Sequence, residues 1–143
     1  MAEYIYIPAQ TVNANANVLL NGSYTCRNVY HQDGSGLFTL RGPSCPNQSF
    51  ARYQVTFNAN IAIPTGGTVG EISVAIAENG EVLGQSIAAI TPAAVEQYGN
   101  VTSTSYIEVP LGCGCPQISI KNNSAANEPI LVRNSNLVIT RIA

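Results

Sequence analysis

The sequence predicts an all-β domain, a two-sheet sandwich or barrel of about ten short strands. The strongest sign is the stretch 52–63, in which apolar and polar side chains alternate along one long half-buried strand. A second sign is Asn79-Gly80 between two apolar runs, which is typical of a two-residue hairpin turn. The apolar positions of the long strand are Tyr53, Val55, Phe57, Ala59, Ile61 and Ile63.

Shorter strands are expected on both sides of the long one, separated by Asn, Gly and Ser. Before it, the candidates are 3–7, 17–20, 27–31 and 36–41, with a tight turn at 33–36. After it, the candidates are 72–78, 81–90, 101–109, 117–122, 129–133 and 136–142. Residues 91–100 fit either a short helix that Thr91 caps and Pro92 begins, or a plain loop.

Composition narrows the class of protein. The 143 residues predict one domain, 1–143. Six scattered Lys and Arg and a net charge of −2 leave no basic stripe for nucleic acid. Charged residues make up only 10% of the chain, so we expect part of its surface to be buried in an assembly. The apolar runs are too short to cross a bilayer, so we expect no membrane insertion.

The N-terminal residues bear on where the protein is made. The first residues, MAEYIYIPAQ, have neither the basic start nor the apolar core of a signal peptide. We therefore expect synthesis in the cytoplasm without a signal peptide, where thiols normally stay reduced.

Two segments carry a resemblance to a known family. Residues 51–57, ARYQVTF, match a Gly-x-Tyr-x-Val-x-Phe strand, with Ala51 in place of the glycine. Near the end, Leu137, Ile139 and Ile142 follow a Leu-x-Ile-x-Arg-hydrophobic closing pattern. From Thr11 to Ala143 the chain resembles the small bacterial and phage jelly-roll domains of the tumour necrosis factor-like type, which include the heads of collagen-like exosporium glycoproteins. The resemblance implies an antiparallel two-sheet jelly-roll sandwich.

The resemblance also implies a homotrimer, because such domains typically bring aromatic residues of three copies together near a threefold axis. Tyr53 and Phe57 are the positions that would inherit this role. The alternative is that both side chains belong to the internal core of the sandwich.

The N-terminal segment lies outside the best-matching region. Residues 1–10 are expected to form either an edge strand of the same sandwich or an arm that docks onto a larger structure. The docking residues of such an arm would be Tyr4, Ile5, Tyr6 and Ile7.

The cysteines of LGCGCP, 111–116, raise the question of a metal or redox site. In the resembling domains this place is a turn between strands, and the glycines suit a turn. C-x-C is shorter than the usual zinc spacing, and no C-x-x-C motif is present, so we expect no metal. A disulfide between Cys45 and either Cys113 or Cys115 remains an alternative to free thiols, as does a link between subunits.

No residue set predicts catalysis. His31, Asp33 and Ser35 lie two residues apart along one strand-turn segment, a spacing that does not supply a triad. The eight acids sit mostly at strand ends and turns, where we interpret them as solvated charges. We therefore expect no enzyme and no cofactor.

The leading hypothesis is a non-enzymatic, homotrimeric knob displayed on a particle, most naturally the exterior of a phage virion as head decoration or fibre. One alternative is a structural protein of a Gram-positive spore or cell surface, although no collagen-like Gly-x-x stalk occurs in the sequence. Another is a carbohydrate-binding module that uses tyrosines such as Tyr24 or Tyr98 to bind a host-surface glycan. The loops expected to vary in recognition are 41–50, 64–70 and 91–100.

Overall fold

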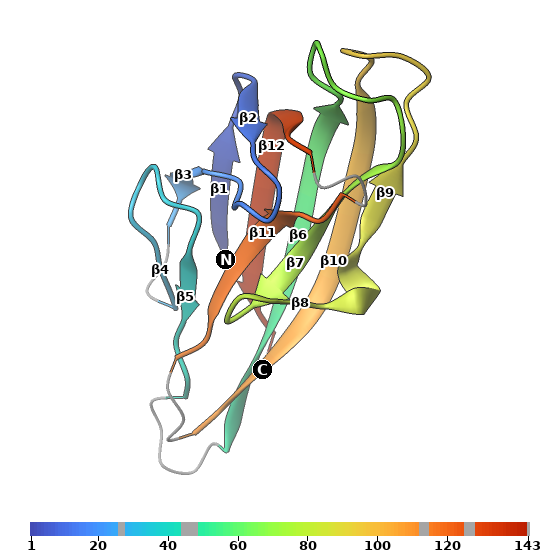
Figure 1. Ribbon diagram of the computed structural model, residues 1–143. Coiled ribbons are helices and arrows are strands. Elements are labelled where there is room, and N and C mark those ends of the chain that lie inside the picture. Colours follow the sequence, from blue (N-terminus) through green and yellow to red (C-terminus); the bar gives the residue numbers. More distant parts are fainter. Residues whose placement is uncertain (26–27, 44–48, 112–114, 125–127, 143) are drawn as a thin grey trace.

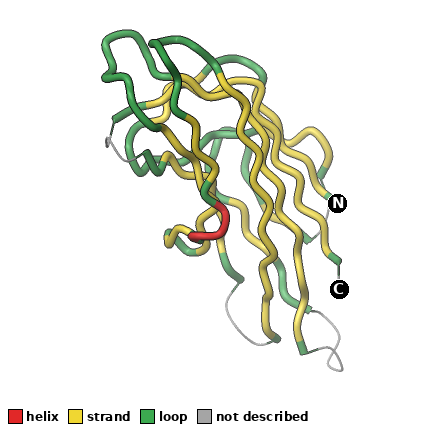
Figure 2. Tube along the Cα trace, turned by 90° about the vertical axis from the view of Figure 1, so that its right-hand side faces the viewer, coloured by secondary structure: helices red, strands yellow, loops and turns green. Residues whose placement is uncertain are grey.

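The computed structural model describes residues 1–25, 28–43, 49–111, 115–124 and 128–142. Two antiparallel six-stranded sheets pack face to face as a sandwich (Figure 1). The only helical element among the described residues is one 3-10 turn, Gly84–Ser86, drawn in red in Figure 2. This confirms the predicted fold class, a jelly-roll-type sandwich.

The first sheet, called sheet A, contains the long strands in the order β10-β6-β12-β1-β3, with β2 paired to β12. Its strands are β1 (Ala2–Tyr6), β2 (Gln10–Val12), β3 (Asn21–Tyr24), β6 (Phe50–Ala62), β10 (Gly99–Pro110) and β12 (Ile130–Arg141).

The second sheet, sheet B, has the order β4-β5-β11-β7-β8, with β9 also paired to β7. Its strands are β4 (Val29–Tyr30), β5 (Phe38–Leu40), β7 (Ile72–Glu78), β8 (Glu81–Val82), β9 (Ala88–Ile90) and β11 (Gln117–Asn122).

The long strand β6 is the centre of sheet A. It pairs with β10 from Gly99↔Ile61 to Pro110↔Phe50, and on its other side with β12. The predicted alternation holds, because its odd-numbered residues from Ala51 to Ile61 are buried and the even-numbered ones face outward. β6 therefore contributes one side of the core and, on its other side, the middle of an outer face.

The core lies between the two sheets. Tyr4, Tyr53 and Phe57 of sheet A and Phe38 of sheet B are among its largest fully buried side chains. They are surrounded by Ile, Val and Leu from both sheets in one continuous apolar cluster. Burial of this cluster, at roughly 25 cal/mol per Å² of apolar surface, is the main force that holds the sheets together.

The Asn79-Gly80 turn forms as predicted. Both residues have positive φ, 52° and 87°, as a hairpin turn of this type requires. The returning segment is interrupted, since β8 and β9 both pair with β7 and the 3-10 turn lies between them. Residues 91–98 form no helix, so the loop alternative is the correct one for this segment.

The N-terminal segment forms a strand of the same sandwich, as one of the two alternatives expected, but it does not lie at the edge of the sheet. β1 lies between β12 and β3, so it is neither an edge strand nor a free docking arm. Tyr4 is only 1% exposed in the core, and the Tyr6 carbonyl accepts a hydrogen bond from Ser135 Oγ at 2.9 Å. Ile5 is partly buried in the same strand, and Ile7, just beyond its end, is 57% exposed. An arm is incompatible with this pairing because freeing it would expose Tyr4 and unpair two neighbours.

Other predicted strands merge or disappear. The candidates 129–133 and 136–142 form the single strand β12, with a register shift between Arg133 and Asn136 where Asn134 has φ 52°. Residues 17–20 are no strand, although Val18 and Leu20 are fully buried. Strands β2 and β3 were not expected.

Tyr53 provides a test of the core. Its hydroxyl donates to the Arg41 carbonyl oxygen at 2.6 Å, with the Asn28 carbonyl oxygen at 3.3 Å. Removal of a buried donor leaves a carbonyl less satisfied. We expect Tyr53→Phe to lower the free energy of unfolding by about 1–2 kcal/mol in chemical denaturation. Tyr30→Phe, at a tyrosine that is 61% exposed, is the control and should change almost nothing. Equal stability of Tyr53→Phe and the wild type would contradict this role.

Candidate interaction surfaces

The two aromatic residues expected at a threefold axis lie inside the sandwich. Tyr53 is 0% exposed and Phe57 is 1% exposed, both on the inward side of β6. Side chains buried between the two sheets of one chain do not reach a second copy. The assignment of Tyr53 and Phe57 to a trimer interface is therefore corrected to the sandwich core, the alternative that the sequence left open.

The opposite side of the same strands forms a surface that we call the Asn/Thr face. It consists of the outward-facing residues of β10, β6 and β12 between the charged positions at either end. Its members are Gln54, Thr56, Asn58, Asn60, Asn100, Thr102, Thr104, Tyr106, Asn136, Val138 and Thr140. None of these residues carries a charge, and the Glu3 carboxylate of the neighbouring strand β1 borders the face, where it accepts a hydrogen bond from Asn136 Nδ2.

The polar groups of the Asn/Thr face bind one another across the strands. Asn100 Nδ2 donates to Asn58 Oδ1 at 2.9 Å and to Asn60 Oδ1 at 3.2 Å. Thr102 Oγ1 also donates to Asn58 Oδ1 at 2.9 Å, and the Thr56 and Thr104 hydroxyls are 3.2 Å apart. These contacts link the side chains of β6 and β10 and use the amide hydrogens of Asn100 and the hydroxyl hydrogen of Thr102 within the face, whereas the oxygen atoms keep lone pairs for further bonds.

Charges mark the two ends of the face. At one end Arg52 Nε pairs with Glu108 Oε2 at 3.2 Å, and both side chains are about half exposed. At the other end Arg133, the neighbour of Asn60 across β6 and β12, lies with its guanidinium 3.7 Å from the centre of the Tyr98 ring. Between these ends Tyr106 projects from β10 with 65% of its surface exposed. A neutral, partly aromatic face flanked by charges is a typical composition for a protein interface.

A cleft lies at the end of the sandwich where the 91–98 loop connects β9 to β10. Its volume is about 320 Å³. The lining residues are Ile90, Thr91, Pro92, Ala93, Gln97, Tyr98 and Gly99. The sequence predicted that this loop takes part in recognition. It could not show that Arg133 lies beside Tyr98, because the two residues are far apart along the chain.

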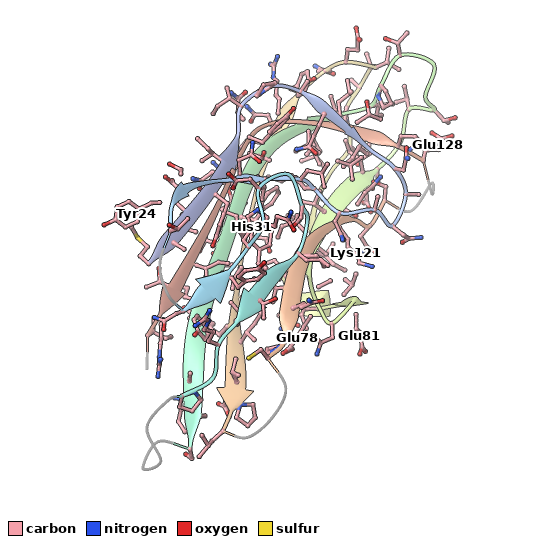
Figure 3. All side chains as sticks on the ribbon, turned by 90° about the vertical axis from the view of Figure 1, so that its left-hand side faces the viewer. Tyr24, His31, Glu78, Glu81, Lys121 and Glu128 are labelled. Atoms are coloured by element: carbon pink, nitrogen blue, oxygen red, sulfur yellow. The ribbon has the colours of Figure 1, made fainter. Side chains whose placement is uncertain are left out.

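His31 serves the fold. Its Nδ1 is 2.9 Å from the Leu37 carbonyl oxygen and its Nε2 is 2.7 Å from the Leu20 carbonyl oxygen. The ring stacks on Phe38 with 4.1 Å between centroids. Asp33 does not orient the ring, since its Oδ1 accepts from the Gly22 backbone N–H at 2.9 Å. His31 is partly buried, and Figure 3 shows Tyr24 at the outer edge of the molecule.

Cys115 is the one cysteine among the described residues, and it is exposed and forms no disulfide with another described residue. Cys45 and Cys113 lie outside the described residues, so their pairing stays a prediction. Within the same described ranges, no group of three or more His, Cys, Asp or Glu side chains gathers as a metal would need. Nor does any helix there have the length and apolar character needed to cross a membrane.

Solved structures similar to this chain share its fold. The globular domain of the zebrafish complement 1qA protein superposes with a TM-score of 0.61 at 12% identity, over 96% of this chain and 94% of that one. Murine APRIL superposes with a TM-score of 0.54 at 10% identity, over 95% and 97% of the two chains. These likenesses show a tumour necrosis factor-like jelly-roll fold, and at this identity they show the fold alone.

Sequence comparisons add no family. No protein-family model matches the chain, and no curated protein matches it in sequence.

The structural role of His31 can be tested directly. The ring nitrogens lie within hydrogen-bonding distance of the Leu37 and Leu20 carbonyl oxygens, and the ring stacks on Phe38. We therefore expect His31→Ala to lower the free energy of unfolding by about 2–4 kcal/mol. Chemical denaturation at one pH and one protein concentration measures the change. The neighbouring exposed Gln32, changed to Ala, should leave stability within about 0.5 kcal/mol. A fully stable His31→Ala variant would show that these contacts contribute little.

Proposed function

We propose that this chain is a non-enzymatic structural protein, a homotrimeric jelly-roll knob displayed on the exterior of a particle, namely a phage virion as head decoration or fibre. The observation that carries the proposal is the Asn/Thr face, whose outward-facing residues on three neighbouring strands of sheet A carry no charge. The tumour necrosis factor-like fold supports it, because the resembling bacterial and phage domains typically form trimers.

The chemistry of the face suits contact between identical chains. Near a symmetry axis each side chain approaches its own copies, so a charged residue would meet the same charge and be repelled. Asn, Gln and Thr avoid this cost because each has both a donor and an acceptor and can bond to its own kind. Depletion of charge in the interface centre is also what measured interfaces show.

The same features suit display rather than chemistry. A chain with 10% charged residues and a continuous apolar core presents a stable, weakly charged body. Burial of the Asn/Thr face in a trimer would explain how so weakly charged a surface stays soluble. The other partner that we propose is the particle surface on which the trimer sits.

A single charge in the centre of the face tests the trimer. Thr56 lies on β6 between Thr104 and Val138, so Thr56→Lys places three like charges at the proposed contact. We expect the wild type to appear in native mass spectrometry at three times the 15.1 kDa of one chain, and Thr56→Lys to appear mainly as monomer.

Thr65→Lys, in an exposed position beyond the end of β6, is the matched control and should remain trimeric. Circular dichroism confirms that both variants are folded. A monomeric wild type, or a trimer that tolerates Thr56→Lys unchanged, would contradict the proposed interface.

Display on a particle needs a separate measurement. Antibody labelling of density-purified virions from cells that carry the sequence should place the chain on the virion exterior. Recovery of the chain only as free protein in the lysate would contradict display, whatever its oligomeric state.

A further inference from the structure

The 91–98 loop lies at one end of the sandwich, beside the loop that follows β6 (Figures 1 and 2), and its residues line most of the cleft. Its volume of about 320 Å³ is at the lower bound of small-molecule sites and has room for one sugar ring. It lies outside the Asn/Thr face as defined above, so trimer formation does not by itself account for it.

The cleft is held in shape before any ligand arrives. Glu96 has a φ of 57°, and its backbone N–H donates to the Ile63 carbonyl oxygen at 2.7 Å, which fastens the loop to the end of β6. The Ala93 N–H donates to Gln97 Oε1 at 3.1 Å across the loop. At the base, a Cβ on Gly99 would lie 2.6 Å from Ile90 Cδ1, so the two ends of the loop are in close contact. Binding here would therefore need little ordering of the protein.

The ring of Tyr98 is fixed in the same way. The Arg133 guanidinium lies 3.7 Å from the ring centre, which is close enough for a cation–π contact. This contact occupies one face of the ring and sets its orientation. The ring can then offer its remaining surface and its hydroxyl to the cleft that Tyr98 lines.

The lining combines two kinds of group. Ile90, Pro92, Ala93 and the Tyr98 ring supply apolar surface, whereas the Thr91 and Tyr98 hydroxyls and the Gln97 amide supply neutral hydrogen-bonding groups. Gln97 Oε1 already accepts within the loop, so its Nε2 hydrogens are the donors that the side chain has left for a ligand's oxygens. No lining residue is charged. A pyranose has this same combination, with an apolar C–H patch on one face and neutral hydroxyls around its edge.

We propose that this cleft binds one neutral pyranose unit of a surface glycan. Tyr98 contacts the apolar patch of the sugar, and Thr91 and Gln97 bind its hydroxyls. A single ring in so small a site binds weakly. Three copies of the site, as the proposed trimer supplies, convert weak binding into useful avidity on a glycan-covered surface.

A glycan array tests the proposal with four full-length proteins, the wild type and three variants. The wild type should bind glycans that share one neutral terminal sugar, and Tyr98→Ala should reduce the signal at least tenfold. Thr91→Val keeps the shape of an exposed side chain but removes its hydroxyl, and should reduce the signal about fivefold. Tyr30→Ala, at a tyrosine that is 61% exposed on β4, is the control and should bind as the wild type does.

The outcomes separate this proposal from the trimer. Saturation-transfer NMR with free glucose, galactose, mannose and N-acetylglucosamine, each tested in turn, reports binding by each variant regardless of avidity, and native mass spectrometry of the same samples reports the oligomeric state. Sugar contact in the NMR experiment without a trimer would support the cleft and count against the assembly. A blank array together with no saturation transfer for the wild type would overturn the cleft, as would binding that Tyr98→Ala and Thr91→Val both retain.

Discussion

The pairing of β6 with both β10 and β12 is the interaction on which the rest of the structure depends. Because side chains alternate along a strand, this one strand serves two surfaces. Its odd-numbered residues fill the space between the sheets, with Tyr53 and Phe57 among the largest buried side chains. Its even-numbered residues form the middle row of the Asn/Thr face. A shift of one residue in register would exchange the two sets, so the core and the outer face are specified together.

Part of this arrangement could be predicted from the sequence because it is local. The alternation along 52–63 and the Asn79-Gly80 turn depend on neighbouring residues, and both correspond to observed elements. The period of a strand tells which residues share a side, but not how far the inward side is enclosed. The resemblance implied an interface role for Tyr53 and Phe57, and the period alone could not decide between that role and the core, where both side chains lie. The position of β1 within the sheet could not be predicted from local sequence either, since it depends on pairing with β12 at the other end of the chain.

The two candidate surfaces depend on the same distant pairings. Asn58 meets Asn100 and Thr102 only because β6 and β10 are in a particular register, and Arg133 lies near Tyr98 because β6 pairs with both β12 and β10. The sequence carried partial signals, namely polar residues of neutral type at 54–60 and 100–106, and a loop rich in small residues at 91–100. Neither signal identifies a surface until the strands are placed side by side.

One face of sheet A connects the fold to the proposed function, because we propose that this face is buried between copies of the chain. Hydroxyl-radical labelling followed by mass spectrometry tests this most directly. In one chain Tyr106 of that face is 65% exposed, and Tyr24 and Tyr30 elsewhere are each 61% exposed, so the three tyrosines form an internal comparison. Labelling of Tyr106 several times slower than that of Tyr24 and Tyr30 is the result predicted for a buried face. Equal labelling of all three tyrosines would contradict it.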